Sequence, residues 1–383
     1  MLGRQKFKIS ESVTAGHPDK MADQISDLIL DWCLYRNTNA KVAIETMVTL
    51  NHIIISGEIS EIEINNNEID IEIRSFLKLL GYDKDGFNYD TVKITFLIKM
   101  QSPEILNSVS KSKKNAAGDQ GIVFGYAINE TKDFMPAPIY YSHILLSRII
   151  TDFPNDFGPD GKIQIVIKYD DDGIPIAINQ LLLSIQHIKD IKYITFKGKL
   201  FEYIKDIISI YNIAMCSYDD FLFNPSGSFV VGGPVSDCGV TGRKIIVDSY
   251  GSGVPHGGGA FSGKDATKID RSAAYIARYI AKNIVHKKLA NECLIKIAYA
   301  IGLHNPLLFH AYTANDIGSL VRNYDLENCC LKIFDLSPSG ICKLLNLDLP
   351  IFSTTASYGH FGREYQEETK EFSWEKIENS LFS

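Results

Sequence analysis

The sequence is poor in the features of secreted, membrane and nucleic-acid-binding proteins. Its seven cysteines are an odd number and include no C-x-x-C pair, so we expect reduced, mostly buried thiols and neither a disulfide framework nor a zinc site. No run of about 18 apolar residues predicts a membrane span, and residues 1–8 lack the apolar core of a signal peptide. The net charge of −7 argues against a general nucleic-acid binder. We therefore expect a cytoplasmic protein with no membrane or nucleic-acid partner.

What the sequence does contain fits a folded protein of several domains. Hydrophobic residues make up 45% and charged residues 22% of the chain, as in soluble globular proteins, and 383 residues suffice for two or three domains. Strand pairs and helices recur roughly three times without a clean sequence repeat. Hairpins dominate, which favours an α+β fold with helices against one face of mixed or antiparallel sheets.

Hydrophobic periodicity predicts the positions of the elements. In chain order they are a helix beginning at Pro18, a hairpin of strands 41–50 and 53–59, a helix within 62–80, strands 93–98, 163–169 and 174–183, a helix 201–210, a strand 244–248, a helix 271–285, a strand 294–303 and two short C-terminal helices. The polar stretch 101–118 is expected to be a long mobile loop, and such loops are often lids. We expect domains at 1–103, 104–231 and 232–383, with approximate boundaries and with structural domains that are discontinuous in sequence.

A locally basic, glycine-rich segment is the most informative feature of this acidic chain. Glycines recur between residues 251 and 263, where they let the backbone approach a ligand closely and point its N–H groups at it. Basic side chains flank this loop, and we interpret four of them as an anion-binding set: Arg243, Lys244, Lys264 and Lys268. Two others, Arg278 and Lys282, are expected to form a solvated helix face.

The same segment resembles only part of a P-loop. Residues 258–264 match G-x-x-x-x-G-K, but Asp265 stands where a P-loop requires Ser or Thr to hold magnesium. The following helix is also predicted to begin several residues late. We therefore expect phosphate binding without a P-loop fold.

Five acidic or histidine positions have more than one possible role. In Gly16-His17-Pro18-Asp19-Lys20, a predicted helix start could hold a phosphate and its Mg²⁺, or His17 and Asp19 could only cap the helix. Asp270 has the same ambiguity between a helix cap and a metal ligand. Glu45 and Glu58 lie inside predicted strands, where a cation, a substrate ammonium or a salt bridge would each satisfy the carboxylate.

Seven short segments follow one another along the chain in a characteristic order. They are Ser10-Glu11-Ser12-Val13, Gly16-His17-Pro18-Asp19-Lys20, Gly118-Asp119-Gln120-Gly121, Asp237-Cys238-Gly239, Thr241-Gly242-Arg243-Lys244, Gly257-Gly258-Gly259-Ala260-Phe261-Ser262-Gly263-Lys264-Asp265 and Tyr358-Gly359-His360-Phe361-Gly362-Arg363. In that order they resemble signatures of the S-adenosylmethionine synthetase family. The resemblance spans almost the whole chain, and the run 257–265 is highly specific.

The resemblance implies a fold, an activity and an assembly. The fold would be α+β, with three similar domains around a pseudo-threefold axis and segments interleaved between domains. The activity would be methionine adenosyltransferase: ATP and L-methionine form S-adenosylmethionine and a bound triphosphate, which the same site cleaves to phosphate and diphosphate. Two Mg²⁺ and one K⁺ per site would be the cofactors. The assembly would be a homodimer or homotetramer with sites at the dimer interface.

The resemblance also assigns roles to residues of this sequence. The implied catalytic set is His17, which would assist departure of the 5′ oxygen, with Lys162, Arg243, Lys244, Lys264 and Lys268. The implied ATP-binding set is His17, Asp160, Lys162, Phe229, Asp237, Arg243, Lys244, Ala260 and Lys264. Methionine would contact Glu58, Gln101, Asp119, Asp237 and Lys268. Asp19 and Asp270 would bind Mg²⁺, and Glu45 would bind K⁺.

Three positions depart from the family pattern, and two other functions stay open. Ser228 replaces the usual Arg, which bears on one nucleotide contact, while Ala15 and Ala116 replace the usual Glu and Gly, which bears on loop closure. The first alternative function is an ATP-dependent phosphotransferase, which would release ADP. The second is a non-catalytic nucleotide-binding subunit, which would bind ATP without methionine-dependent turnover.

Overall fold

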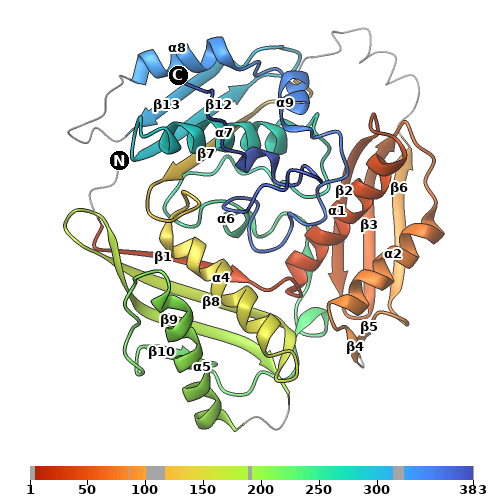
Figure 1. Cartoon of the computed structure of the whole chain (residues 1–383). Helices are drawn as coiled ribbons and strands as arrows, with labels where there is room; N and C mark the ends of the chain where they lie inside the picture. The colour runs from red at the N-terminus through yellow and green to blue at the C-terminus, as the bar shows by residue number, and fades with distance from the viewer. Residues whose placement is uncertain (1–4, 85, 101–116, 189–191, 314–322, 383) are drawn as a thin grey trace.

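Three larger β-sheets organise the part of the chain that the computed structural model describes, residues 5–84, 86–100, 117–188, 192–313 and 323–382 (Figure 1). One contains β2 (Lys41–Thr49), β3 (His52–Ser60), β6 (Lys93–Met100) and the short β11 (Gly239–Val240). The second contains β1 (Phe7–Val13), β8 (Phe157–Tyr169), β9 (Pro175–His187) and β10 (Phe221–Phe223). The third contains β7 (Gly121–Ile128), β12 (Glu292–Tyr299) and β13 (Leu308–Thr313), and a small ribbon pairs β4 (Asp83–Lys84) with β5 (Phe87–Asn88).

Each larger sheet takes a strand from a distant part of the chain. β1 pairs with β8, β11 pairs with β2 and β7 pairs with β12, in every case antiparallel. The pairs β3–β6 and β9–β10 are parallel. The predicted α+β class with mixed sheets and interleaved segments is therefore confirmed, whereas the boundaries near residues 103 and 231 stay predictions.

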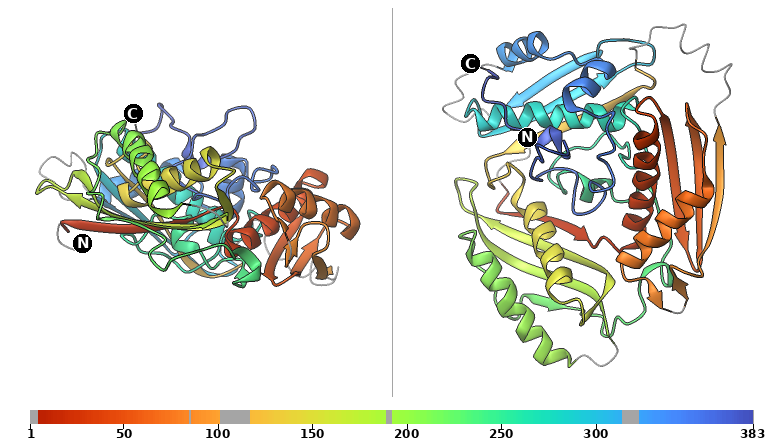
Figure 2. Two further views of the ribbon diagram at one scale, coloured as in Figure 1. Left: turned by 90° about the horizontal axis from the view of Figure 1, so that it is seen from below. Right: turned by 45° about the vertical axis from the view of Figure 1, so that its right-hand side comes forward.

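Helices cover one face of each larger sheet. α1 (Pro18–Arg36) packs on β2 beside α2 (Asn66–Leu79), and α4 (Ala137–Asp152) crosses β1 and β8. α5 (Tyr193–Ser209) contacts β10 through the rings of Phe201 and Phe221. α7 (Ile269–His286) lies on β7 and β12 with α9 (Pro338–Leu345) against it, and α8 (Asn323–Ile333) contacts β13. Seen from below in Figure 2, α4 and α5 lie on the same side of their sheet.

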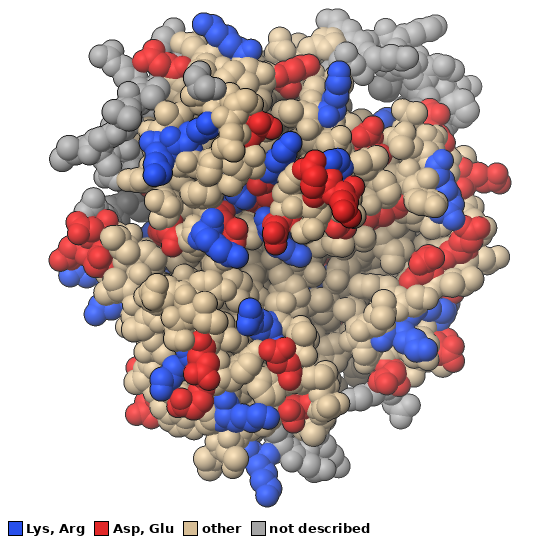
Figure 3. Space-filling view, viewed as in Figure 1, with Lys and Arg blue, Asp and Glu red and all other residues tan. Residues whose placement is uncertain are grey.

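The three units surround a centre that holds α6 (Ile245–Asp248) and the C-terminal segment (Figure 1). Charged side chains are buried there: the Lys20 ammonium donates to Asp23 at 2.9 Å and to Asp248 at 2.5 Å. On the outer surface, basic and acidic side chains are interspersed over the face drawn in Figure 3.

The predicted strand at residues 244–248 is wrong, because these residues form the helical turn α6. The Asp248 N–H donates to the Lys244 carbonyl at 2.9 Å, and Val247 and Asp248 are buried. Tertiary packing of this turn therefore overrides the β propensity of the Ile-Ile-Val run. The strand predicted at 294–303 is present but ends at Tyr299, where a turn follows.

The predicted solvated face of Arg278 and Lys282 is also wrong. Both side chains are buried in α7 and share the carboxylate of Glu375, which accepts Arg278 Nε at 3.0 Å and Lys282 Nζ at 2.6 Å. Burial disfavours the charged form of Glu375, but the two cations outweigh it and lower the pKa of that carboxyl. These two cations are therefore structural and face the protein interior.

The cysteines match the prediction from the sequence, whereas one helix and several strands were not predicted. All seven cysteines are free and four of them are buried, which confirms the expected thiols. Among the described residues, every helix is too short or too polar to cross a bilayer. The sequence patterns do not predict β1, β7, β13 or α4. Most of α4 is buried, so it lacks the polar face that reveals an amphipathic helix.

Candidate active site

The start of α1 places His17 in a buried and polar environment. Pro18 occupies the first helical position, and His17 Nδ1 accepts the backbone N–H of Asp19 at 3.2 Å. Because Nδ1 is the acceptor, Nε2 carries the proton of the neutral ring. Burial and the nearby Lys244 ammonium lower the pKa of His17 to about 4, so the ring is neutral near pH 7. His17 does cap the helix, and its catalytic role stays a prediction.

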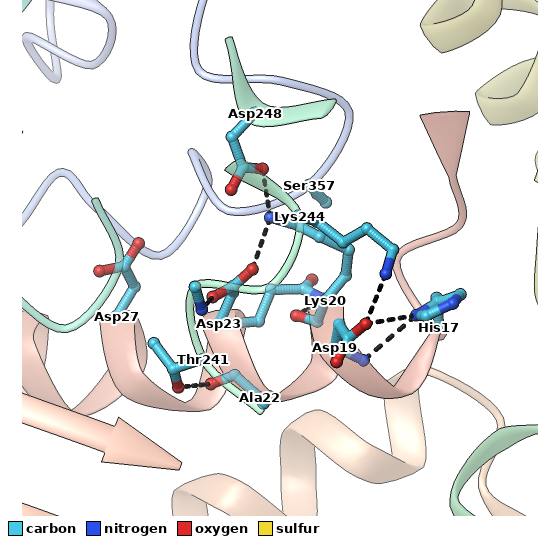
Figure 4. A network of polar contacts seen from close by, with 12 residues as sticks. His17, Asp19, Lys20, Ala22, Asp23, Asp27, Thr241, Lys244, Asp248 and Ser357 are labelled. Atoms are coloured by element: carbon cyan, nitrogen blue, oxygen red, sulfur yellow. Dashed lines mark hydrogen bonds and ion pairs between the residues drawn. The ribbon is translucent and has the colours of Figure 1, made fainter. Parts of the chain in front are cut away.

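Asp19 links the helix start to the segment that carries Arg243 and Lys244. Its carboxylate contacts Lys244 Nζ at 2.5 Å, as Figure 4 shows. It also accepts the Val240 N–H at 3.0 Å. Arg243 Nη1 lies 3.6 Å from the same carboxylate. Burial disfavours the charged form, but the hydrogen bonds from Lys244 and Val240 outweigh it and lower the pKa of Asp19. Asp19 is thus ionised beside two cations.

The sheet of β8 brings further polar side chains toward His17. Lys162, on β8, is half exposed and its Nζ lies 3.9 Å from Glu11. The charge of Lys162 lowers the pKa of His17, and the charge of Asp237 raises it. Asp160 is buried, which raises the pKa of its carboxyl, and it accepts the backbone N–H of Gly233 at 2.8 Å. These residues surround the start of α1 with charges of both signs.

A second charged cluster lies at the start of α7. Lys264 Nζ lies 2.6 Å from the Asp270 carboxylate, and Lys268 pairs with the buried Asp265. Lys268 is the cap residue of α7, and Asp270 lies within its first turn. The alternative that Asp270 caps the helix is therefore wrong, because its carboxylate binds an ammonium instead of the helix end. The helix begins well after residue 264, as expected for a site that is not a P-loop.

The two clusters lie along one edge of β2. The Ile44 N–H donates to the Gly263 carbonyl at 2.9 Å, and the Thr241 N–H donates to the Thr46 carbonyl at 3.0 Å. The loop and the turn also meet directly, since a Cβ added at Gly242 would lie 2.6 Å from the Ala260 Cβ. The segments carrying Lys244 and Lys264 are therefore neighbours in space.

The glycines of the loop serve the protein's own packing as well. A Cβ at Gly259 would lie 2.2 Å from Cγ of Asp270, so a side chain there would displace this carboxylate. A Cβ at Gly121 would lie 3.5 Å from the same carboxylate, which places the segment 118–121 beside the start of α7. The loop backbone thus approaches Asp270 closely within the chain, and its predicted approach to a ligand stays a prediction.

The ion pairs that define these clusters do not include several other predicted site residues. Glu45 and Glu58 are exposed on the outer face of β2 and β3, and Asp119 is exposed just before β7. Phe229 is half-buried, and its N–H donates to His187 Nε2 at 3.0 Å. Gln101 lies outside the described residues.

Sequence reasoning missed two aspartates that hold the site segments. Asp23 accepts the N–H of Gly242, and Asp27 accepts the N–H of Gly263, each at 2.8 Å. Their signal in the sequence is the spacing of four residues that follows Asp19 along α1, which places all three on one helix face.

The fold and the site define a class: a three-unit α+β protein whose interleaved segments assemble charged clusters suited to a polyphosphate. Comparison with known proteins narrows this class. Three domain models described as S-adenosylmethionine synthetase match the chain, the N-terminal domain at residues 5–103, the central domain at 114–229 and the C-terminal domain at 231–376. The chain belongs to the S-adenosylmethionine synthetase family.

Individual relatives are similar to this chain over nearly its whole length. It is 44% identical over 376 residues to the S-adenosylmethionine synthase of Pelagibacter ubique, with 96% of each chain covered. It is also 44% identical over 393 residues to that of Ruegeria pomeroyi, with 98% of each covered. The family's activity is methionine adenosyl transfer, which confirms the enzyme class predicted from the sequence and disfavours a phosphotransferase or a non-catalytic subunit.

Proposed function

We propose that the two charged clusters along β2 bind ATP and that this site joins the sulfur of L-methionine to C5′ of the nucleotide. One observation carries the proposal: segments far apart in the sequence bring together a neutral histidine, two carboxylates and two lysines at the same strand edge. They are His17, Asp19 and Lys244 on one side and Lys264 and Asp270 on the other.

The chemistry explains why the site holds cations and no general base for the first step. The methionine thioether has no proton to remove, so the rate depends on aligning sulfur with C5′ and on stabilising the departing triphosphate. His17 has its Nε2–H available to donate to the 5′ oxygen. The phosphates would be surrounded by Lys162, Arg243, Lys244, Lys264 and Lys268. The same cations would then hold the triphosphate while water cleaves it to phosphate and diphosphate.

Metal dependence fits the carboxylates of the two clusters. Mg²⁺ prefers oxygen ligands and is often held by one or two protein carboxylates plus phosphate oxygens, which Asp19 and Asp270 with a bound nucleotide would supply. The two Mg²⁺ expected per site would neutralise charge that develops on the triphosphate. Glu45 would provide a carboxylate for the one K⁺.

The remaining contacts concern the nucleoside and methionine. Phe229 would stack on adenine, and Asp160, Asp237 and Ala260 would lie near the nucleoside. Methionine would contact Glu58, Gln101, Asp119, Asp237 and Lys268. These roles for the nucleoside and methionine contacts rest on the family resemblance.

A homodimer or homotetramer would complete this site. Glu45 and Glu58 point outward from the sheet of β2 and β3, and the same face exposes 38% of Met47 and 56% of Leu97. Exposed apolar side chains on one face of a sheet favour burial against another protein surface. A second subunit on this face would cover them and bring the two glutamates next to its own charged clusters.

The test is an assay of the purified full-length chain with ATP, Mg²⁺, K⁺ and labelled methionine. We expect labelled S-adenosylmethionine, phosphate and diphosphate, and no product when methionine is omitted. Release of ADP would instead indicate a phosphotransferase. Nucleotide binding without methionine-dependent turnover would indicate a non-catalytic subunit.

A further inference from the structure

Four aspartates on one face of α1 bind backbone amides that come from distant parts of the chain. They follow one another at intervals of four residues, which places them in a row along the helix. The bonds are Asp19 with Val240 at 3.0 Å, Asp23 with Gly242 at 2.8 Å, Asp27 with Gly263 at 2.8 Å, and Asp31 with Phe352 at 3.0 Å and Ser353 at 2.7 Å. Figure 4 shows Asp19, Asp23 and Asp27 along α1.

The two middle members of this row hold segments of the same kind. Gly242 and Gly263 both have left-handed backbone conformations, with φ of 79° and 77°. Gly242 directly precedes Arg243 and Lys244, and Gly263 directly precedes Lys264. Each carboxylate therefore binds the amide immediately before the cations of a charged cluster. Such a bond fixes where the following side chain leaves the backbone.

Each of these segments has a second anchor on β2. The Ile44 N–H donates to the Gly263 carbonyl, and the Thr241 N–H donates to the Thr46 carbonyl. The segments are thus clamped between helix α1 and the edge of β2. Without Asp23 or Asp27, β2 and other bonds to α1, such as those of Val240 with Asp19 and Thr241 with Ala22, would still hold the segments in the fold. The glycine amide just before the cations would lose the carboxylate that fixes it.

The structure assigns Asp23 and Asp27 as positioning residues that place Lys244 and Lys264 for the polyphosphate. This inference rests on the proposed function, since it requires that the two lysines bind phosphates. Neither aspartate has to touch substrate, because each acts through the glycine amide that it binds. A displacement of about 1 Å in such a group can cost up to roughly a hundredfold in rate.

Asp23 is the better position to test. Its second oxygen accepts Lys20, but Lys20 keeps its contact with Asp248 at 2.5 Å when Asp23 is replaced, so the buried ammonium retains a charged partner. At Asp27 the same change would leave the buried guanidinium of Arg271 without its carboxylate. Asp31 provides a matched control, because it makes the same kind of bond on the same helix face to residues outside both charged clusters.

The experiment compares Asp23→Ala, Asp23→Asn and Asp31→Ala with the wild type. Three quantities are measured: the melting temperature, kcat and KM for ATP per folded molecule, and binding of inorganic tripolyphosphate by calorimetry. We expect Asp23→Ala to lower kcat by about ten- to a hundredfold and to weaken tripolyphosphate binding. Asp23→Asn, which retains an acceptor oxygen, should recover part of both. Asp31→Ala should melt earlier and keep wild-type kcat and binding.

A purely structural role gives a different pattern. If Asp23→Ala has the same kcat per folded molecule and the same tripolyphosphate affinity as Asp31→Ala, the positioning role is refuted. Tripolyphosphate binding needs neither methionine nor turnover, so it separates this inference from the proposed function. If the wild type binds tripolyphosphate and the Asp23→Ala variant does not, the positioning role is supported even if no S-adenosylmethionine forms.

Discussion

Replacement of His17 by asparagine separates its two roles. In the structure His17 Nδ1 accepts the Asp19 N–H and caps α1, while Nε2–H is available as a donor. Asparagine is also a good N-cap, so His17→Asn keeps the cap and removes the imidazole donor. The variant should therefore fold normally but stabilise the departing 5′ oxygen less well.

The expected magnitudes differ for the two roles. Loss of one hydrogen-bond donor to a developing oxyanion costs about 10²- to 10³-fold in rate, and this benefit arises as the C5′–O5′ bond breaks. Loss of a cap would cost about 0.5–2 kcal/mol of stability, which asparagine should largely spare. Formation of S-adenosylmethionine should therefore slow much more than hydrolysis of added triphosphate, whose cleavage we expect nearer the lysines.

The lowered pKa of His17 adds a pH-dependent check. Between pH 6.5 and about 4, the unfolded chain binds a proton on this ring that the folded chain does not. The wild type should therefore lose stability as the pH falls through this range, by at most roughly 3 kcal/mol from this residue. His17→Asn should lack that contribution. Melting temperatures of both proteins from pH 7 to 4 test the difference, together with the two rates on the same preparations.

Equal losses of both rates in His17→Asn would refute the leaving-group role. A parallel fall in stability of wild type and variant between pH 6.5 and 4 would contradict the neutral, buried ring. The control is His17→Ala, which removes both cap and donor. It should lose stability in addition to rate.

Three further expectations concern a cation, a buried ion pair and the assembly. Lys264→Met should lower turnover by more than about a hundredfold, and a folded variant of near-normal rate would rule out phosphate neutralisation by Lys264. Glu375→Gln leaves Arg278 and Lys282 buried without their carboxylate, so it should destabilise the protein by about 3–5 kcal/mol in urea denaturation; a loss below about 1 kcal/mol would contradict this role. Sedimentation of the active enzyme should show a dimer or tetramer, and activity from a pure monomer would contradict a shared site.

Local signals in the sequence predict much of the fold and little of its long-range pairing. Pro18 after a histidine correctly marks the start of α1, and the β-branched runs on either side of Asn51-His52 correctly predict the β2–β3 hairpin. By contrast, β1 pairs with β8 from more than a hundred residues away. A strand's own residues state its propensity but not its partner, so the interleaving entered the prediction only through the family resemblance.

Sequence periodicity does not decide which cations of the basic segment are buried and which are partly exposed. From Arg243 to Lys282 the chain carries seven cations, and the sequence alone gives each the same charge. In the structure they form two groups. The side chains of Arg271, Arg278 and Lys282 are at most 5% exposed and bind fully buried carboxylates. Those of Arg243, Lys244, Lys264 and Lys268 are 15–54% exposed.

The difference between these groups has a physical basis. A buried ion pair is costly to open, because each freed charge stays desolvated, so the interior cations cannot turn toward a ligand. A lysine whose partner carboxylate is also partly exposed, as in the Lys264–Asp270 pair with both side chains 25% exposed, can leave that carboxylate at little cost, since water replaces each partner. The four partly exposed cations are those flanking the glycine-rich loop and the Gly242 turn, where Asp23 and Asp27 hold the backbone. An acidic chain can thus present a basic site by fixing the backbone with buried carboxylates and leaving the adjoining cationic side chains partly exposed.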